Sequence, residues 1–205
     1  MLILPYYYVN TTMKNQDAII IKTLLEHKEQ ELSIASLSTL THKDYKTTHT
    51  IVKRLEKNKL LTLQQFGKSY KVVLHYFAHP LIFEAEYLRR KEILQNKNLR
   101  VMQDYFRKEL KTALYVLLLF GSYTTKTSTK HSDIDLFFIA PDSDTEFEKK
   151  VVRIAHLIPL PLHVNVFTER EFVAMKTSKE NTVGSEVIKK NIILYGTEAY
   201  YELLQ

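Results

Sequence analysis

Two acidic residues separated by a single position begin an apolar run in the second half of the chain. These are Asp133 and Asp135, and residues 136–138 are all apolar. Alternate side chains of a β-strand point to the same face, so a strand over 134–139 would hold both carboxylates side by side. Neighbouring carboxylates repel each other unless they share a hard divalent cation, and Mg²⁺ prefers such oxygen ligands. The pair is a candidate metal site, with two ordinary surface acids as the alternative.

A Gly-Ser pair eleven residues upstream follows another apolar run, which we expect to form a buried strand over 115–120. Gly121 would let the backbone turn sharply and come close to a ligand. Ser122 offers a hydroxyl and an amide to a phosphate at an expected helix start. A phosphate-binding turn beside paired carboxylates is typical of phosphoryl or nucleotidyl transfer, in which metal ions stabilise the attacking and leaving oxygens.

The segment 120–138 resembles the nucleotidyltransferase superfamily that shares its fold with DNA polymerase beta. It is most similar to the minimal nucleotidyltransferases (MNT type), which include kanamycin-nucleotidyltransferase-like and antitoxin members. Their pattern is Gly-Ser, a spacer of about ten residues, and Ser-Asp-x-Asp-Leu, matched here by Gly121-Ser122 and by residues 132–136. Segments 168–172 and 192–196 also look like family members, and the resemblance covers roughly 113–205.

The resemblance implies a bound nucleoside triphosphate, such as ATP, and a divalent cation, Mg²⁺ or Mn²⁺. Asp133 and Asp135 would bind the cation, and Gly121, Ser122 and Ser132 would hold the triphosphate. The spacer has Thr125-Lys126 where many relatives have Arg-Gly. Two lysines of the spacer, Lys126 and Lys130, are therefore further candidates for contacts with phosphates.

Family members usually carry a third carboxylate on a later strand, which we expect here over 162–167. Alternation places His163 and Asn165 on one face of that strand, and neither is an acid. Asn165 is the candidate third catalytic residue because its carbonyl can bind a metal, although an amide cannot act as a general base. His163 is a candidate base, and Glu169 lies nearby at a helix start.

Two functions follow from this pattern. The first is an enzyme that transfers a nucleoside monophosphate from a nucleoside triphosphate to an acceptor hydroxyl or phosphate, with a protein or an RNA as the candidate acceptor. The second is a catalytically degenerate, nucleotide-binding transcription regulator or antitoxin-like protein, because the third carboxylate is missing. A third acid close to Asp133 and Asp135 would favour the enzyme.

The first half of the chain shows three helical patterns followed by two short β-like runs. The helices are expected over 15–27, 34–40 and 45–59, capped by Asn15, Ser33 and Asp44. The β runs over 60–66 and 70–76 are joined by residues 67–69, as in a hairpin. This order is typical of a winged helix-turn-helix.

One face of the third expected helix is basic and polar, opposite an apolar stripe. Its lysines can bind phosphates while a histidine and a threonine lie near base edges, so we expect this face to bind DNA. The candidate DNA-binding residues are Lys46, His49, Thr50, Lys53 and Lys57, with Lys68 at the hairpin tip. A solvated helix face, or a winged helix used for dimerisation or protein docking, is the alternative.

We therefore expect an α+β protein with a winged helix-turn-helix domain over 1–78, a helical connector over 79–111 and a polymerase-beta-like α/β domain with a small mixed sheet over 112–205. In the connector, a helix beginning at Pro80 is interrupted at 95–98 and followed by another over 99–111. In the last domain, helices are expected over 145–157, 169–175 and 185–191.

The charge distribution supports two different tasks. Residues 1–100 contain 16 Lys and Arg against 9 Asp and Glu, whereas residues 101–205 contain 13 against 14. A basic surface attracts phosphate backbones, with ordinary surface charge that keeps the protein in solution as the alternative. The absence of cysteine suits a reducing cytoplasm, and residues 1–10 lack the basic start of a signal peptide. We expect no membrane association, because the longest apolar run, 113–120, is too short to span a bilayer, and a homodimer is a candidate assembly.

Overall fold

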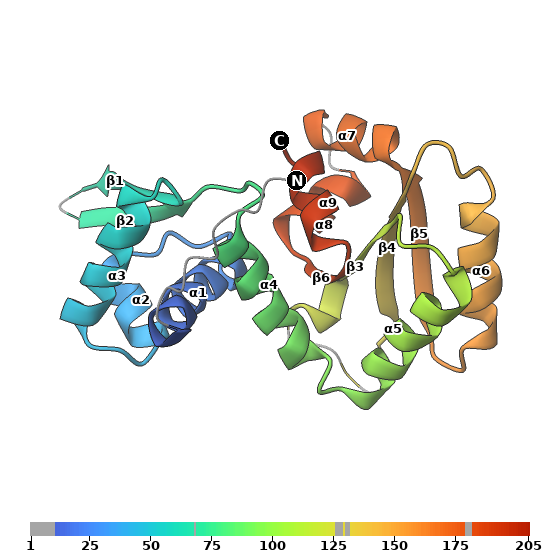
Figure 1. Cartoon of the computed structure of the whole chain (residues 1–205), viewed down its shortest axis with the longest axis horizontal. Coiled ribbons are helices and arrows are strands. Elements are labelled where there is room, and N and C mark those ends of the chain that lie inside the picture. Colours follow the sequence, from blue (N-terminus) through green and yellow to red (C-terminus); the bar gives the residue numbers. More distant parts are fainter. Residues whose placement is uncertain (1–10, 68, 126–128, 130–131, 179–181) are drawn as a thin grey trace, which may run out of the picture. The chain divides into compact units, whose positions relative to one another are not determined.

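The computed structural model describes residues 11–67, 69–125, 129, 132–178 and 182–205, without the side chains of 11–14. The chain separates into two compact units. Unit 1 contains Met1–His75 and His79–Ala85, and unit 2 contains Tyr76–Ala78 and Glu86–Gln205. Figure 1 shows the elements of both units along the chain.

Unit 1 contains three helices and a two-stranded hairpin, followed by the start of a fourth helix. The elements are α1 (Thr11–Glu26), α2 (Ile34–Leu40), α3 (Tyr45–Lys57), β1 (Leu61–Phe66), β2 (Ser69–Leu74) and α4 (Pro80–Ile93), which continues into unit 2. The strands pair antiparallel, with Leu61 opposite Leu74 and Phe66 opposite Ser69. Apolar faces of the helices and the hairpin form one buried core, which includes Ile21, Leu37 and Leu55.

Two of the three expected helix caps are confirmed. The Ser33 hydroxyl accepts a hydrogen bond from the backbone of Ser36 at the start of α2, and Asp44 accepts one from Thr47 at the start of α3. Hydrogen bonds from the side chain and backbone of Thr47 hold the pKa of Asp44 below its usual value. The expected cap at Asn15 is wrong, because α1 already begins at Thr11 and Asn15 lies inside it.

Unit 2 is built on a four-stranded mixed sheet in the order β5-β4-β3-β6. The strands are β3 (Val116–Phe120), β4 (Ile134–Ala140), β5 (Leu162–Thr168) and β6 (Ile192–Tyr195). β3 pairs antiparallel with β4 and β6, and β4 pairs parallel with β5. The remaining elements are α5 (Lys97–Leu110), η1 (Gly121–Tyr123), α6 (Phe147–Leu157), α7 (Glu169–Thr177), α8 (Val183–Lys189) and α9 (Thr197–Leu203).

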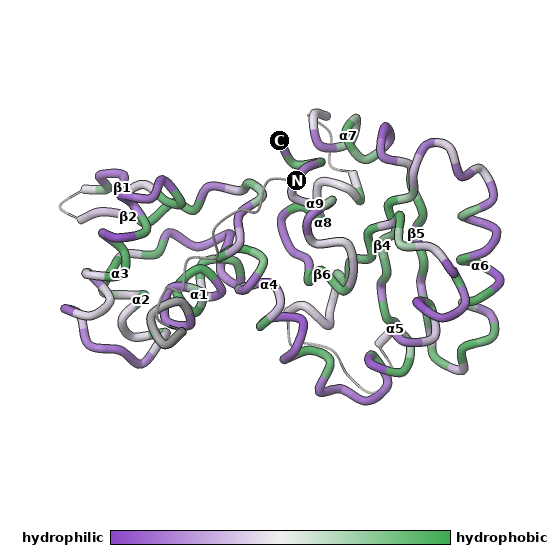
Figure 2. Tube along the Cα trace, in the orientation of Figure 1, coloured by the Kyte–Doolittle hydropathy of each residue, from purple (hydrophilic) through white to green (hydrophobic). Residues whose placement is uncertain are grey.

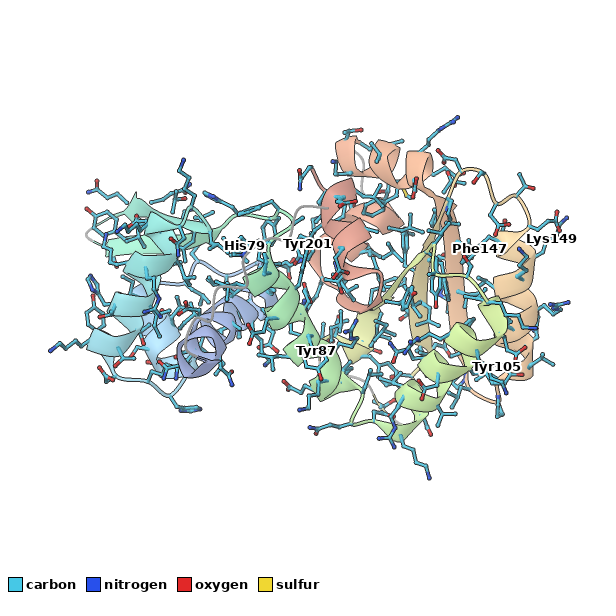
Figure 3. The ribbon with its side chains drawn as sticks, in the orientation of Figure 1. His79, Tyr87, Tyr105, Phe147, Lys149 and Tyr201 are labelled. Atoms are coloured by element: carbon cyan, nitrogen blue, oxygen red, sulfur yellow. The ribbon has the colours of Figure 1, made fainter. Side chains whose placement is uncertain are left out.

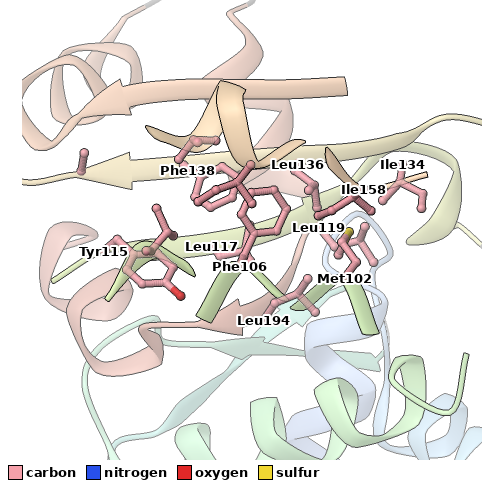
Figure 4. Packing of buried hydrophobic residues seen from close by; sticks show 14 of the residues in the cluster. Met102, Phe106, Tyr115, Leu117, Leu119, Ile134, Leu136, Phe138, Ile158 and Leu194 are labelled. Carbon is pink, nitrogen blue, oxygen red and sulfur yellow. The ribbon is translucent and has the colours of Figure 1, made fainter. Parts of the chain in front are cut away.

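Alternate residues of the strands face two different layers of helices. On one face, Leu117, Leu136 and Phe138 pack with side chains of α5 and α6, including Phe106 (Figure 4). On the other face, the Phe137 ring contacts residues of β5 and α7. Both central strands are strongly apolar along their length, whereas α6 alternates between polar and apolar residues (Figure 2). The two central strands, β3 and β4, are therefore largely buried between two layers of packed elements, whereas the edge strand β5 is only partly buried.

The α+β class with a small mixed sheet is confirmed. The region expected to connect two domains is helical. Its two helices, α4 and α5, are separated by a short break, and Asn96 caps the start of α5. Its second helix is more than a connector, because the α5 residues Leu99, Met102 and Phe106 belong to the core of unit 2. β6 and α9 complete the sheet and its second layer, although neither was expected as an element.

A buried ion pair ties the unit 2 part of α4 to the end of the chain. The Arg89 guanidinium donates to Glu86 at 2.7 Å and to the carbonyl of Asn191 at 2.5 Å. The hydroxyl of Tyr201, which Figure 3 labels, donates to the second oxygen of Glu86 at 2.8 Å. Burial and the charge of Glu86 raise the pKa of Tyr201, so this hydroxyl stays protonated.

No helix among the described residues is long and apolar enough to cross a bilayer. 

Candidate active site and candidate DNA-binding surface

Antiparallel pairing of β3 and β4 brings the Gly-Ser turn against the second acid. Phe120, the last residue of β3, lies opposite Asp135, and Gly121 follows with φ +69°. A Cβ atom added at Gly121 would lie 2.2 Å from Oδ2 and 3.0 Å from Cγ of Asp135. The carboxylate therefore packs against the bare Cα of residue 121. Glycine is required at residue 121 for two reasons, the left-handed backbone and the close approach of the Asp135 carboxylate.

Short-range hydrogen bonds hold the backbone on both sides of this contact. Gly121 begins the single turn η1, and the hydroxyl of Thr124 donates to the Gly121 carbonyl at 2.7 Å. Thr125 donates in the same way to the Ser122 carbonyl at 2.9 Å. Before the first acid, the Ser132 hydroxyl accepts from the backbone N–H of Thr129 at 2.9 Å. The predicted nucleotide-binding residues Gly121, Ser122 and Ser132 thus lie in tight local turns.

The two acids differ in position. Asp133 is exposed and immediately precedes β4, whereas Asp135 lies inside the strand with its side chain 24% exposed. Because Ile134, Leu136 and Phe138 belong to the core with α5 and α6, Asp135 points to the opposite face. In the described part of the chain, no three His, Cys, Asp or Glu side chains lie close enough together to enclose a metal ion.

The neighbouring strand β5 places His163 directly beside Asp135. The parallel register pairs Asp135 with His163 and Phe137 with Asn165. The Nδ1 atom of His163 lies 3.2 Å from Oδ1 of Asp135, within hydrogen-bonding distance. Asn165 lies one row further along the same face, and its Nδ2 atom is buried with no partner among the described residues. The acid is therefore closer to the imidazole than to the amide that the sequence favoured.

Glu169, a further candidate from the sequence, lies away from the Asp135–His163 pair. Thr168 pairs with Ala140, so Glu169 follows the far end of β5, six residues beyond His163. At about 3.3 Å per strand residue, that separation is about 20 Å. Glu169 lies at the exposed start of α7, where Thr168 and Glu171 form a reciprocal capping box. Lys126 and Lys130 lie outside the described residues.

In unit 1, α3 presents the predicted basic face to solvent. Lys46, Thr50, Lys53 and Lys57 are exposed and His49 is half-buried, whereas Thr48, Ile51, Val52 and Leu55 are buried. The ammonium of Lys53 is 2.9 Å from Glu56, and the Thr50 hydroxyl donates to the Lys46 carbonyl at 2.8 Å. Arg54 pairs with Asp17 and so fastens α3 to α1. Lys68, at the hairpin tip, lies outside the described residues.

Several exposed aromatic residues lie on the same elements and were not among the predicted site residues. Tyr45, in the first turn of α3, is 55% exposed, and its ring stacks on His49 with centroids 6.1 Å apart. Phe66 and Tyr70, near the hairpin turn, are also exposed. Large aromatic side chains at polar helix and hairpin positions were the sequence signal that could have identified them.

Comparisons with known proteins give a family match for each half of the chain. Residues 102–200 match the family described as "Polymerase beta, Nucleotidyltransferase", a match that includes the sheet, the Gly121-Ser122 turn and both acids. The match supports the nucleotidyltransferase-type domain that the resemblance of segment 120–138 implied for this part of the chain. Residues 13–78 match a family described as HVO_A0114. No curated protein and no solved structure matches the chain.

Proposed function

We propose that unit 2 binds a nucleoside triphosphate with a divalent cation, Mg²⁺ or Mn²⁺, and transfers its nucleoside monophosphate to an acceptor. The observation that carries the proposal is the contact of the Asp135 carboxylate with the Cα of Gly121, which a single methyl group at residue 121 would abolish. This contact joins the two halves of the motif, a phosphate-binding turn and a metal-binding acid, at one place.

The chemical types of the side chains at this site suit a divalent cation. Asp133 and Asp135 supply carboxylates, which neutralise the ion and give it oxygen ligands. When bound, the cation would neutralise the leaving pyrophosphate and activate the acceptor oxygen. The turn at Gly121 and Ser122 would hold the triphosphate, and Ser132 would keep the first acid in position through its bond to Thr129.

A second candidate function is nucleotide binding without turnover, as in a regulator or antitoxin-like protein. It is favoured by Asn165, which stands on the strand where relatives usually have a third carboxylate and whose buried amide nitrogen has no partner among the described residues. It is also favoured by the lack of a three-membered metal-binding group among the described residues. In that case the site would bind the nucleotide but would not form product.

For unit 1 we propose a winged helix-turn-helix that binds DNA through α3. The buried stripe of α3 fixes the opposite face toward solvent, where Lys46 and Lys57 can contact phosphates. Tyr45 adds an exposed ring next to His49, so the first turn of α3 offers groups for base edges as well as charges. The basic excess of residues 1–100 supports the same partner.

The transfer reaction is tested by incubating the full chain with each α-³²P-labelled nucleoside triphosphate, Mg²⁺ or Mn²⁺, and candidate RNA or protein acceptors, the chain itself included. We expect one nucleotide to label an acceptor, and Asp133→Ala/Asp135→Ala to remove the label. Asp104→Ala, an exposed acid on α5, is the matched control and should label as the wild type does.

If the double variant labels as strongly as the wild type, transfer does not depend on this site and the proposal fails. If the wild type binds a nucleotide but labels nothing under any of these conditions, the second candidate function is the correct one.

A further inference from the structure

The contact between Asp135 and His163 has a geometry that suits two ligands of one ion. The distance from His163 Nδ1 to Asp135 Oδ1 is 3.2 Å. Two ligand atoms that each lie about 2.1 Å from a cation are about 3.0 Å apart at an octahedral angle and about 3.4 Å apart at a tetrahedral one. The observed separation lies between these values, so both atoms can bind one cation with little movement.

Both side chains are accessible from solvent and are held by the sheet. His163 is 65% exposed and Asp135 is 24% exposed at the side chain. The parallel register of β4 and β5 places them directly opposite each other, and the neighbouring rows are fixed by the pairing of Ile134 with Leu162 and of Leu136 with Val164. Neither backbone needs to move for the pair to bind an ion.

We propose that His163 is a metal ligand of this site and that its imidazole makes the site select Mn²⁺, or a similar transition-metal ion, over Mg²⁺. The proposal rests on the proposed function, because it specifies the cation of the same site. Imidazole nitrogen suits transition metals, whereas Mg²⁺ demands oxygen ligands. Two carboxylates and a neutral imidazole also carry one negative charge fewer than three carboxylates, which weakens the purely electrostatic attraction on which Mg²⁺ depends.

A plain hydrogen bond is the competing interpretation of the same distance. In that case His163 would only orient the Asp135 carboxylate, and the preference between the two metals would not depend on the imidazole.

If the proposal is correct, Asp135 and His163 would supply two ligands, since no three metal-binding side chains are grouped in the described part of the chain. Asp133, water and triphosphate oxygens would complete the shell as the nucleotide binds.

The test compares Mn²⁺ and Mg²⁺ binding to the full chain by calorimetry, with and without a non-hydrolysable nucleoside triphosphate. Pulsed electron paramagnetic resonance of bound Mn²⁺ then detects a directly coordinated nitrogen. The variants are His163→Ala, His163→Asp and, as a matched exposed histidine on α6, His156→Ala. Because His163 is largely exposed, its replacement should leave the fold intact, which circular dichroism checks.

We expect the wild type to show the nitrogen signal and to bind Mn²⁺ more tightly than Mg²⁺. His163→Ala should lose the nitrogen signal and at least about tenfold in Mn²⁺ affinity, with a smaller loss for Mg²⁺. His163→Asp should raise Mg²⁺ affinity and reduce the preference for Mn²⁺, whereas His156→Ala should behave as the wild type does.

If His163→Ala keeps the Mn²⁺ affinity while Asp133→Ala/Asp135→Ala abolishes it, the inference is wrong but the proposed metal site stands. If neither ion binds the wild type, even with the nucleotide, both the inference and the metal-dependent function are wrong.

Discussion

The basic face of α3 and the site around Gly121 and Asp135 hold their charged groups in different ways. On α3, Lys46 and Lys57 extend from a regular helix into solvent, and nothing but the helix face defines their direction. In unit 2, Asp135 packs against the Cα of Gly121 on one side and lies beside His163 on the other. We therefore expect binding at the α3 face to depend on its total charge. We expect the site in unit 2 to depend on the exact positions of its atoms.

This difference predicts how each region responds to substitution. Removing one lysine from an exposed helix face should weaken binding in proportion to the charge lost. Disturbing a site whose atoms touch should cost far more, because catalytic groups misplaced by about 1 Å can lose a hundredfold in rate.

Each unit contains an ion pair of its own, and the two pairs differ in burial. Arg89 is 5% exposed and its partner Glu86 is fully buried, whereas Arg54 is 33% exposed. Arg89→Met leaves a buried carboxylate unpaired and should lower the free energy of unfolding of unit 2 by about 3–5 kcal/mol. Arg54→Met should cost unit 1 less, about 1–2 kcal/mol, because Asp17 is only 10% exposed but Arg54 keeps a third of its side chain in contact with water. Chemical denaturation of each variant measures both values, and equal losses would contradict the contrast.

Two glycines with positive φ separate backbone strain from site geometry. Gly121→Ala should reduce transfer roughly a hundredfold, since the new methyl group displaces the Asp135 carboxylate. Gly67 has φ +59°, but no described atom lies within 4 Å of a Cβ placed there. Both variants should lose about 1–2 kcal/mol of stability from left-handed backbone strain. Only Gly121→Ala should lose transfer activity, and an active Gly121→Ala protein would contradict the site.

The α3 lysines should contribute separately and by smaller amounts. Replacing Lys46, Lys53 and Lys57 with Ala should weaken DNA binding about tenfold and reduce the salt dependence by about one unit for each lost phosphate contact. Lys53→Ala should have the smallest effect, because its ammonium already pairs with Glu56. Fluorescence anisotropy at several salt concentrations measures the slope. An unchanged slope in the triple variant would exclude α3 as the DNA-binding element.

Asn165→Asp should produce the smallest change in transfer, and that change should be a gain. The substitution places a third carboxylate on the face that carries Asp135 and His163, so transfer should increase severalfold, up to about tenfold. The variant should be less stable without metal, because the acids repel each other, and should recover when a divalent cation is added. Thermal unfolding with and without cation measures this. A variant that shows neither effect would mean that residue 165 does not face the metal.

Local patterns predicted the elements and the residue types of the site. The apolar runs predicted β3, β4 and β5, and the caps at Ser33 and Asp44 are confirmed. The predicted start of α1 was wrong because residues 11–14 contain a single apolar residue, Met13, and so show no helical periodicity. The packing of α5 into unit 2 was missed, although Leu99, Met102 and Phe106 follow the spacing of a buried helix face.

The contacts that make the site depend on long-range pairing, which one sequence does not reveal. The approach of Gly121 to Asp135 requires the register that pairs Phe120 with Asp135. The contact of Asp135 with His163 requires the parallel register of β4 and β5 across 28 residues of chain. The alternation of side chains along β5 places His163 and Asn165 on the same face and does not distinguish them. Only the register shows that His163 is the neighbour of Asp135.

If the Gly121 turn and the two acids form one site, nucleotide binding must depend on the acids and on the cation that they hold. Measuring how tightly the chain binds a nucleotide tests this most directly. Equilibrium dialysis of each radiolabelled nucleoside triphosphate, with and without divalent cation, measures it for the wild type and for Asp133→Ala/Asp135→Ala. We predict one cation-dependent nucleotide per chain for the wild type and at least about a hundredfold weaker binding for the variant. Equal binding by the two proteins, or wild-type binding that ignores the cation, would contradict the account.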